Sequence, residues 1–161
     1  MIVPSAIRRA VVLLAFAIPA SAGAQVQKSG SDDRSEVLAV VKRLFDGMRA
    51  GDSAMVRSTF HSTALLWSAG VRNGTPEARV DSVDSFVRAV GTPHPEKWDE
   101  RTSGEIVHID GTLAVVWADY SFHVGSRFSH CGVDTFQLAR TTSGWKIVAL
   151  ADTRRREGCR Q

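Results

Sequence analysis

Two aspartates and two histidines in the second half of the chain are groups that could carry out acid–base chemistry. Asp119 and His123 lie in one strand-like segment, and His130 and Asp134 lie in the next. Alternate residues of a strand point to the same side of a sheet. A two-residue turn at Gly125-Ser126 would therefore place all four side chains on one face. Because a histidine beside a carboxylate can move a proton, we predict these four as candidate catalytic residues.

Other interpretations of this cluster remain open. The four side chains could form a hydrogen-bonded network that only holds the sheet together. The two histidines and a carboxylate could also bind a metal ion, although no compact histidine spacing is present. We expect neither a metal nor a cofactor, since the chain has no P-loop, Rossmann glycine set, nucleophile elbow or zinc motif. A slip of one residue in the Gly125-Ser126 turn, or in the turn of the last hairpin, would move these side chains to the other face of the sheet.

The same face has an apolar end. If Arg140 lies opposite Trp145 in the last hairpin, Leu138, Ala149 and Ala151 share the face of Asp134. Aromatic and aliphatic walls suit a flat, partly apolar molecule. We therefore predict a ligand pocket lined by Trp67, Trp117, Phe128, Phe136 and Ile147.

The opposite face of the strands is expected to carry Tyr120, Phe122, Leu150 and Asp152. Its apolar centre predicts a contact with a second copy of the chain through Tyr120 and Phe122. The alternative is that the chain's own tail or loops cover this face.

Helices precede these strands. An apolar stripe at helical spacing predicts a helix that begins near Asp33 and ends at Gly51; its members are Val37, Val40, Val41, Leu44, Phe45 and Met48. Asp52 can cap a second short helix. A third helix is expected from Asp81 or Ser82 to Gly91. The predicted strands are 64–69, 100–109, 113–124, 128–140 and 145–152, with turns at Asn73-Gly74 and Asp110-Gly111.

The chain begins with a segment typical of a secretory signal peptide. Arg8 and Arg9 precede an apolar run over 10–18, and small residues follow up to Ala24. We predict a signal peptide over 1–24 with cleavage after Ala24, a disordered lead-in over 25–32 and a single domain over 33–161. Cleavage after Ala22 and an uncleaved anchor are the alternatives. The mature protein is expected to be secreted or periplasmic, without a membrane anchor.

Charge and cysteine content agree with an exported protein. Loss of the two leader arginines lowers the formal net charge from +3 to +1, which argues against a nucleic-acid partner. Two cysteines in an exported domain favour a disulfide between Cys131 and Cys159 over two free thiols. The basic cluster Arg154-Arg155-Arg156 is expected to be a solvated tail that Cys159 ties down.

The order of elements resembles the nuclear transport factor 2-like superfamily, and in particular its small bacterial SnoaL-like and secreted "putative lumazine-binding" branches. The segments that carry the resemblance are 50–52, 111–116, 130–134, 144–147 and 153–159. The resemblance implies an α+β fold in which a cone-shaped, curved antiparallel sheet wraps around N-terminal helices. Superfamily members of the ketosteroid isomerase type use an aspartate base with a Tyr/Asp pair, but Tyr120 is expected on the other face here.

The function expected from these features is the binding of a small, partly apolar molecule between helices and sheet, without assigned chemistry. A small isomerase, dehydratase or hydrolase that uses a pocket Asp/His pair is one alternative. A homodimeric protein-interaction module is the other.

Overall fold

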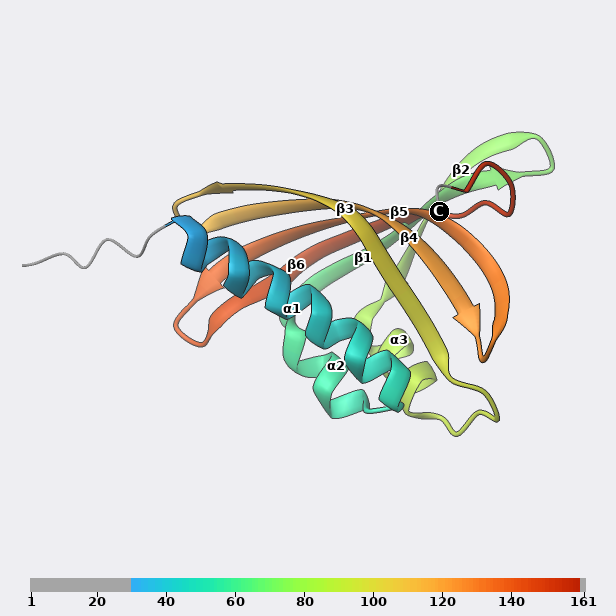
Figure 1. The fold of residues 1–161 in the computed structure, drawn as a ribbon, viewed down its shortest axis with the longest axis horizontal. Coiled ribbons are helices and arrows are strands. Elements are labelled where there is room, and N and C mark those ends of the chain that lie inside the picture. Colours follow the sequence, from blue (N-terminus) through green and yellow to red (C-terminus); the bar gives the residue numbers. More distant parts are fainter. Residues whose placement is uncertain (1–29, 160–161) are drawn as a thin grey trace, which may run out of the picture.

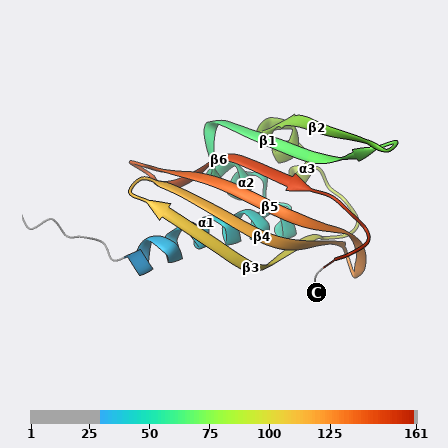
Figure 2. The same ribbon diagram turned by 90° about the horizontal axis from the view of Figure 1, so that it is seen from above.

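A curved six-stranded sheet is the framework of residues 30–159, the part of the chain that the computed structural model describes. The strand order is β2-β1-β6-β5-β4-β3, and the helices of this part lie on the concave side (Figure 1). Figure 2 shows the opposite side of the sheet without a covering helix. The expected α+β fold is therefore confirmed. The predicted signal peptide and most of the predicted lead-in lie outside the described residues.

Helix α1 (Gly30–Ala50) supplies one side of the core. The predicted stripe is buried at Val37, Val41, Leu44, Phe45 and Met48, which pack against the sheet. The helix begins at Gly30, before the expected start at Asp33. Asp33 does not cap it, because its carboxylate accepts a hydrogen bond from the guanidinium of Arg140 on the sheet.

Two helix starts follow the capping chemistry of the sequence. Gly51 adopts a φ of 67° after α1, a conformation that glycine tolerates best. The Asp52 carboxylate then accepts from the backbone N–H of Met55 at 2.8 Å and caps α2 (Ser53–Thr59). Ser82 caps α3 (Val83–Gly91) by accepting from the N–H of Ser85.

The first hairpin contains a strand that the sequence does not predict. Strand β1 (Phe60–Arg72) turns at Asn73 and Gly74, both with positive φ, into β2 (Thr75–Ser82). Every residue of β2 is exposed, so it has no alternating apolar pattern that could reveal it. Strand β1 pairs in parallel with β6, whereas the other strand pairs are antiparallel.

The remaining strands lie within two residues of their expected bounds. They are β3 (Trp98–Asp110), β4 (Leu113–Val124), β5 (Arg127–Thr141) and β6 (Gly144–Thr153). Long antiparallel ladders join them in sequence order. The structure thus has the expected strands, and the faces of these strands depend on two irregularities in register.

A bulge in β5 corrects the predicted faces of the β4–β5 hairpin. The expected turn is present, with His123 opposite Phe128, but the next pair is Phe122 with His130. Ser129 is therefore an extra residue, and one extra residue reverses the faces beyond it. His130 and Asp134 share the helix-covered face with Tyr120, whereas Asp119 and His123 point to the outer face.

A second bulge has the same effect in the last hairpin. Arg140 lies opposite Trp145 as predicted, and Leu138 lies opposite Ile147. The following pairs are Gln137 with Ala149 and Phe136 with Leu150, so Val148 is the extra residue. Leu150 and Asp152 therefore face the helices, and Ala149 and Ala151 face outward, which reverses the predicted placement.

The predicted dimer face is wrong in its residues. Tyr120 is only 3% exposed and, like the partly buried Phe122, lies on the concave side. The Tyr120 ring lies close to Gly132 and its hydroxyl donates to the backbone oxygen of Thr153, so the end of the chain covers Tyr120, as the alternative expected.

The disulfide between Cys131 and Cys159 is confirmed, with 5.9 Å between the two Cα atoms. It joins β5 to the segment that follows β6. Within residues 30–159, no helix has the length and apolar content needed to cross a bilayer.

Candidate functional site

A cavity of about 280 Å³ lies between the helices and the concave face of the sheet. One wall is apolar and consists of side chains from α1, α3, β1 and β6: Leu44, Phe45, Met48, Phe86, Leu66 and Leu150. Phe45 also packs edge-on against the core ring of Phe136, with 6.1 Å between ring centroids. This wall is a continuation of the hydrophobic core and can contact an apolar ligand body.

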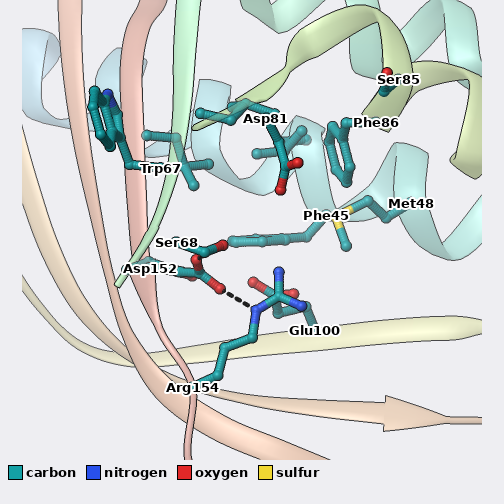
Figure 3. Close-up of a pocket in the computed structure, with 14 residues that line it drawn as sticks. Phe45, Met48, Trp67, Ser68, Asp81, Ser85, Phe86, Glu100, Asp152 and Arg154 are labelled. Atoms are coloured by element: carbon teal, nitrogen blue, oxygen red, sulfur yellow. Dashed lines mark hydrogen bonds and ion pairs between the residues drawn. The ribbon is translucent and has the colours of Figure 1, made fainter. Parts of the chain in front are cut away.

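The other wall is polar. Glu100 of β3, Asp134 of β5, Asp152 of β6 and Arg154 line it. Figure 3 shows Glu100 and Asp152 near the guanidinium of Arg154, with Phe45 and Phe86 across the cavity. Three acids from three different strands therefore meet beside one cation.

Asp152 is held from two sides. Its Oδ2 accepts from Arg154 Nε at 2.6 Å, and its Oδ1 accepts from Ser68 Oγ at 2.5 Å. The register requires this geometry, since Asp152 lies opposite Ser68 on one side and opposite Asp134 on the other. Burying a carboxylate is costly unless it is paired, and here the ion pair and the hydroxyl provide that pairing.

Glu100 and Asp134 form a hydrogen-bonded carboxyl pair. Burial, with a smaller contribution from Asp152, raises the pKa of Glu100 to about 7, although Asp134 and Arg154 oppose the shift. Burial and the neighbouring Glu100 raise the pKa of Asp134 well above its ordinary value. Two close carboxyls in a dry site cannot both ionise easily, so the pair retains a proton near neutral pH.

One oxygen of this pair is unsatisfied. Asp134 Oδ2 is buried and has no hydrogen-bond partner among residues 30–159. Buried polar atoms are rarely left without a partner. Because Asp134 lines the cavity, a bound molecule is well placed to supply it.

The predicted catalytic set is only partly assembled. Asp134 lines the cavity, and His130 lies on the same side but borders a separate surface depression. Asp119 and His123 point to the outer face because of the Ser129 bulge. The predicted Asp119–His130 pair therefore does not form, whereas Asp119 and His123 stay on the same outer face, away from the cavity. A metal site with both histidines is excluded by the same geometry.

The predicted pocket residues have three different environments. Trp67 borders the cavity, but Figure 3 shows its indole pointing away from Asp81 and Phe45. Trp117 and Phe128 are on the outer face and are 49% and 42% exposed. Phe136 and Ile147 are fully buried in the core beneath the cavity.

Three residues of the polar wall were not predicted from the sequence. Arg154 follows the end of β6, two residues after Asp152, and this spacing is a weak signal for an ion pair on one face. From the sequence, Asp152 is expected to face outward and Arg154 to belong to a solvated tail. Glu100 is a single acid at the start of a strand, and no pattern in the sequence distinguishes it.

Tyr120 faces inward but its hydroxyl already has an acceptor. It donates to the backbone oxygen of Thr153 at 2.8 Å. Burial, together with the charge of Asp152, raises the pKa of Tyr120. Tyr120 thus fixes the end of β6 and does not present its O–H to the cavity as an oxyanion donor would.

The arrangement can hold hydrogen-bonding groups and exchange a proton near neutral pH. It offers a carboxyl pair with one proton, an ion-paired carboxylate and a guanidinium opposite an apolar wall. In residues 30–159, no group of three or more His, Cys, Asp or Glu side chains is arranged to bind a metal ion.

Comparisons with solved structures define the class of fold. A nuclear transport factor 2-like protein with a cystatin-like fold from Novosphingobium aromaticivorans has a TM-score of 0.64 and 12% identity, over 80% of this chain and 84% of that chain. A similar protein of unknown function from Shewanella baltica has a TM-score of 0.61 and 18% identity, over 80% and 98%. A "putative dehydratase" of this family from Streptomyces avermitilis has a TM-score of 0.60 and 16% identity, over 79% and 99%.

The sequence model of the family described as "Putative lumazine-binding" matches residues 32–151. The chain belongs to this family, a branch of the nuclear transport factor 2-like superfamily. No curated protein sequence matches the chain. The family and the cavity together define a domain with a ligand-binding pocket.

Proposed function

We propose that this chain is an exported binding domain for a small molecule with an apolar body and a polar edge. The observation that carries the proposal is the two-sided cavity. Phe45 and Phe86 form one side, and the Glu100–Asp134 pair and the Asp152–Arg154 ion pair form the other.

The volume limits the size of the ligand. Ligand pockets are commonly roughly 300–1,000 Å³, and the cavity here is about 280 Å³. A single fused-ring system of modest size suits such a space better than a sterol or a nucleotide.

The charges limit the chemistry of the polar edge. The protonated carboxyl pair offers one O–H donor and several acceptor oxygens, and the unpartnered Asp134 Oδ2 is one of these. A neutral edge on which N–H donors alternate with carbonyl or ring-nitrogen acceptors complements this wall. Lumazine, the ligand in the family's description, is a flat molecule with such an edge. A bare anion would meet four acids, the three of the polar wall and Asp81, and is disfavoured.

Titration of lumazine into the mature protein tests the proposal. Asp134→Leu removes the hydrogen-bonding carboxyl and Arg154→Gln removes the cation of the polar wall, and each is expected to weaken binding about tenfold, the usual size of the effect of a lost buried hydrogen bond. Arg88→Gln, on the exposed side of α3, is the matched control and should bind as the unaltered chain does. Equal binding by all four proteins would contradict the assignment of the site.

A second function is favoured by the carboxyl pair itself. A glutamate with a pKa of about 7 can take and return a proton near neutral pH, as an isomerase or dehydratase requires. The acid–base group of this alternative is Glu100 with Asp134, in place of the Asp/His pair expected from the sequence. Turnover of a bound molecule that Glu100→Gln abolishes while binding survives would favour an enzyme.

Export is part of the proposal and rests on the leader pattern, with the disulfide as support, since disulfides persist in oxidising compartments. Mass measurement on protein recovered from the periplasm of a bacterial host is expected to give a chain that begins at Gln25.

We also propose that the outer face of the sheet joins two copies of the chain. One row of cross-strand neighbours spans the sheet, from Val80 through Trp67, Ala151, Thr135 and Trp117 to Ile106. Its large apolar members are 39–54% exposed. An exposed apolar row of this kind can pair with itself around a two-fold axis, the commonest symmetry of soluble oligomers.

A further inference from the structure

The segment after β6 is fixed to the sheet at several points. The Cys131–Cys159 disulfide holds its end, and Cys131 and Arg155 exchange two backbone hydrogen bonds of 2.9 Å. Gly132 lets the chain cross closely, because a Cβ there would lie 1.8 Å from the Thr153 oxygen. The three consecutive arginines therefore start from a held backbone, in agreement with the expectation that Cys159 ties this segment down.

These arginines border a depression that is entirely basic. Its lining consists of His130, Arg154, Arg155 and Arg156, and its volume is about 280 Å³. Burial lowers the pKa of His130, and the positive charges of Arg154 and Arg156 lower it further against the opposing effect of Asp152. A depression lined by three guanidinium groups favours an anion.

Two of the three arginines have no acidic partner. Arg154 is paired with Asp152, whereas neither Arg155 nor Arg156 takes part in an ion pair within residues 30–159. Arg155 makes only a long hydrogen bond, from Nε to the Gly158 oxygen at 3.4 Å. Guanidinium groups bind phosphate and sulfate oxygens through paired N–H groups, which makes adjacent unpaired arginines well suited to a tetrahedral oxyanion.

We propose that His130, Arg155 and Arg156, with Arg154 at their side, form a binding site for a phosphate group, either free or carried as a phosphate monoester. The site lies beside the ligand cavity and does not depend on the function proposed for that cavity. Arg154 is the one residue that borders both.

The test is a titration of the full mature chain, with its disulfide intact, by inorganic phosphate and separately by phenyl phosphate. Binding is followed by calorimetry and by the NMR signals of the His130 ring, with sodium chloride of equal ionic strength as the reference. Both phosphates are expected to shift the His130 signals, and the chloride reference is not. A monoester that binds more tightly than free phosphate would identify the carried group as the preferred form.

Two double variants distinguish a specific phosphate site from nonspecific electrostatic attraction. Arg155→Gln/Arg156→Gln is expected to weaken phosphate binding about tenfold or more, the usual effect of losing charge-assisted hydrogen bonds. Arg34→Gln/Arg88→Gln removes the same charge from exposed helix positions and should change it less than about twofold. The proposal is overturned if the two double variants lose affinity equally, or if neither phosphate moves the His130 signals.

Discussion

At the scale of single residues, the chemistry of the cavity depends on where one proton resides. Glu100 and Asp134 share it because burial makes a second negative charge costly. The buried carboxylate of Asp152 is instead stabilised by hydrogen bonds from Arg154 and Ser68. One wall therefore contains both a protonated acid pair and an ion-paired carboxylate, and they differ only in their neighbours.

This pair should make stability depend on pH. The pKa of Glu100 is raised from an ordinary 4.5 to about 7, so the folded chain keeps a proton that the unfolded chain releases as pH rises. Stability is expected to fall between about pH 4.5 and 7, by about 1–3 kcal/mol. Glu100→Gln should flatten this fall. Urea unfolding at several pH values measures it, and Glu77→Gln on exposed β2 is the control. An unchanged pH profile in Glu100→Gln would contradict the assignment.

A second residue-scale prediction concerns Gly132. Alanine there would bring its Cβ within 1.8 Å of the Thr153 oxygen, so the crossing segment must move. We expect Gly132→Ala to cost about 1–3 kcal/mol of unfolding free energy, as overpacking does. Gly70→Ala, also on a strand but with open space around it, is the matched control. Equal unfolding midpoints for the two variants would show that the segment is not held against β5.

Asp134 is the residue of the polar wall that the sequence identified, because it has a carboxylate at an inward strand position. The roles of Glu100, Asp152 and Arg154 could not be predicted from the sequence, since these roles depend on which strands pair and in what register. Trp67 and Trp117 are the opposite case, in which the sequence predicted pocket residues that do not line the cavity with their rings. Their residue type suits a pocket, but strand alternation turns their rings outward.

At the scale of elements, caps and turns were the reliable signals. The Asp52 cap and the Asn73-Gly74 turn act locally and are present as predicted, and Ser82, one of the two expected starts of the third helix, caps α3. The first helix is the exception, because it begins at Gly30 and not near Asp33. The two bulges at Ser129 and Val148 have no comparable signature in the sequence, and each reverses the faces of the strand beyond it. Strand positions could therefore be predicted, and their orientation could not.

The disulfide that fixes the segment after β6 leads to a prediction about stability at the scale of elements. A 28-residue loop closed by Cys131–Cys159 should contribute about 3–4 kcal/mol to stability in the chain-entropy view. Cys131→Ala/Cys159→Ala is expected to lose that amount in urea unfolding. Reductant should lower the stability of the unaltered chain towards that of the variant and leave the variant unchanged. A variant as stable as the oxidised parent would contradict a structural role for the bond.

At the scale of the whole molecule, the two faces of the sheet have different environments. The concave face packs against the helices and surrounds the cavity, while the outer face leaves a row of apolar side chains exposed. The sequence predicted that one face would bind a ligand and the other a second copy. The bulges exchanged several of the residues assigned to each face.

The dimer proposal predicts a change of oligomeric state in one variant. Trp117→Lys places a charge within the outer row, on β4, and is expected to convert a dimer to a monomer at micromolar concentration. Sedimentation velocity measures this, with Ser143→Lys in the exposed β5–β6 turn as the control. A monomeric unaltered chain, or a Trp117→Lys protein that remains dimeric, would contradict an interface on this face.

The most direct test of the central claim is native mass spectrometry of mature protein recovered from an oxidising compartment. If the cavity binds a small molecule, the unaltered chain and Arg88→Gln should carry an added mass that leaves on denaturation, and Arg154→Gln should carry less of it. A bare mass for the unaltered chain, both as isolated and after incubation with lumazine, would contradict the account of the cavity as a ligand site.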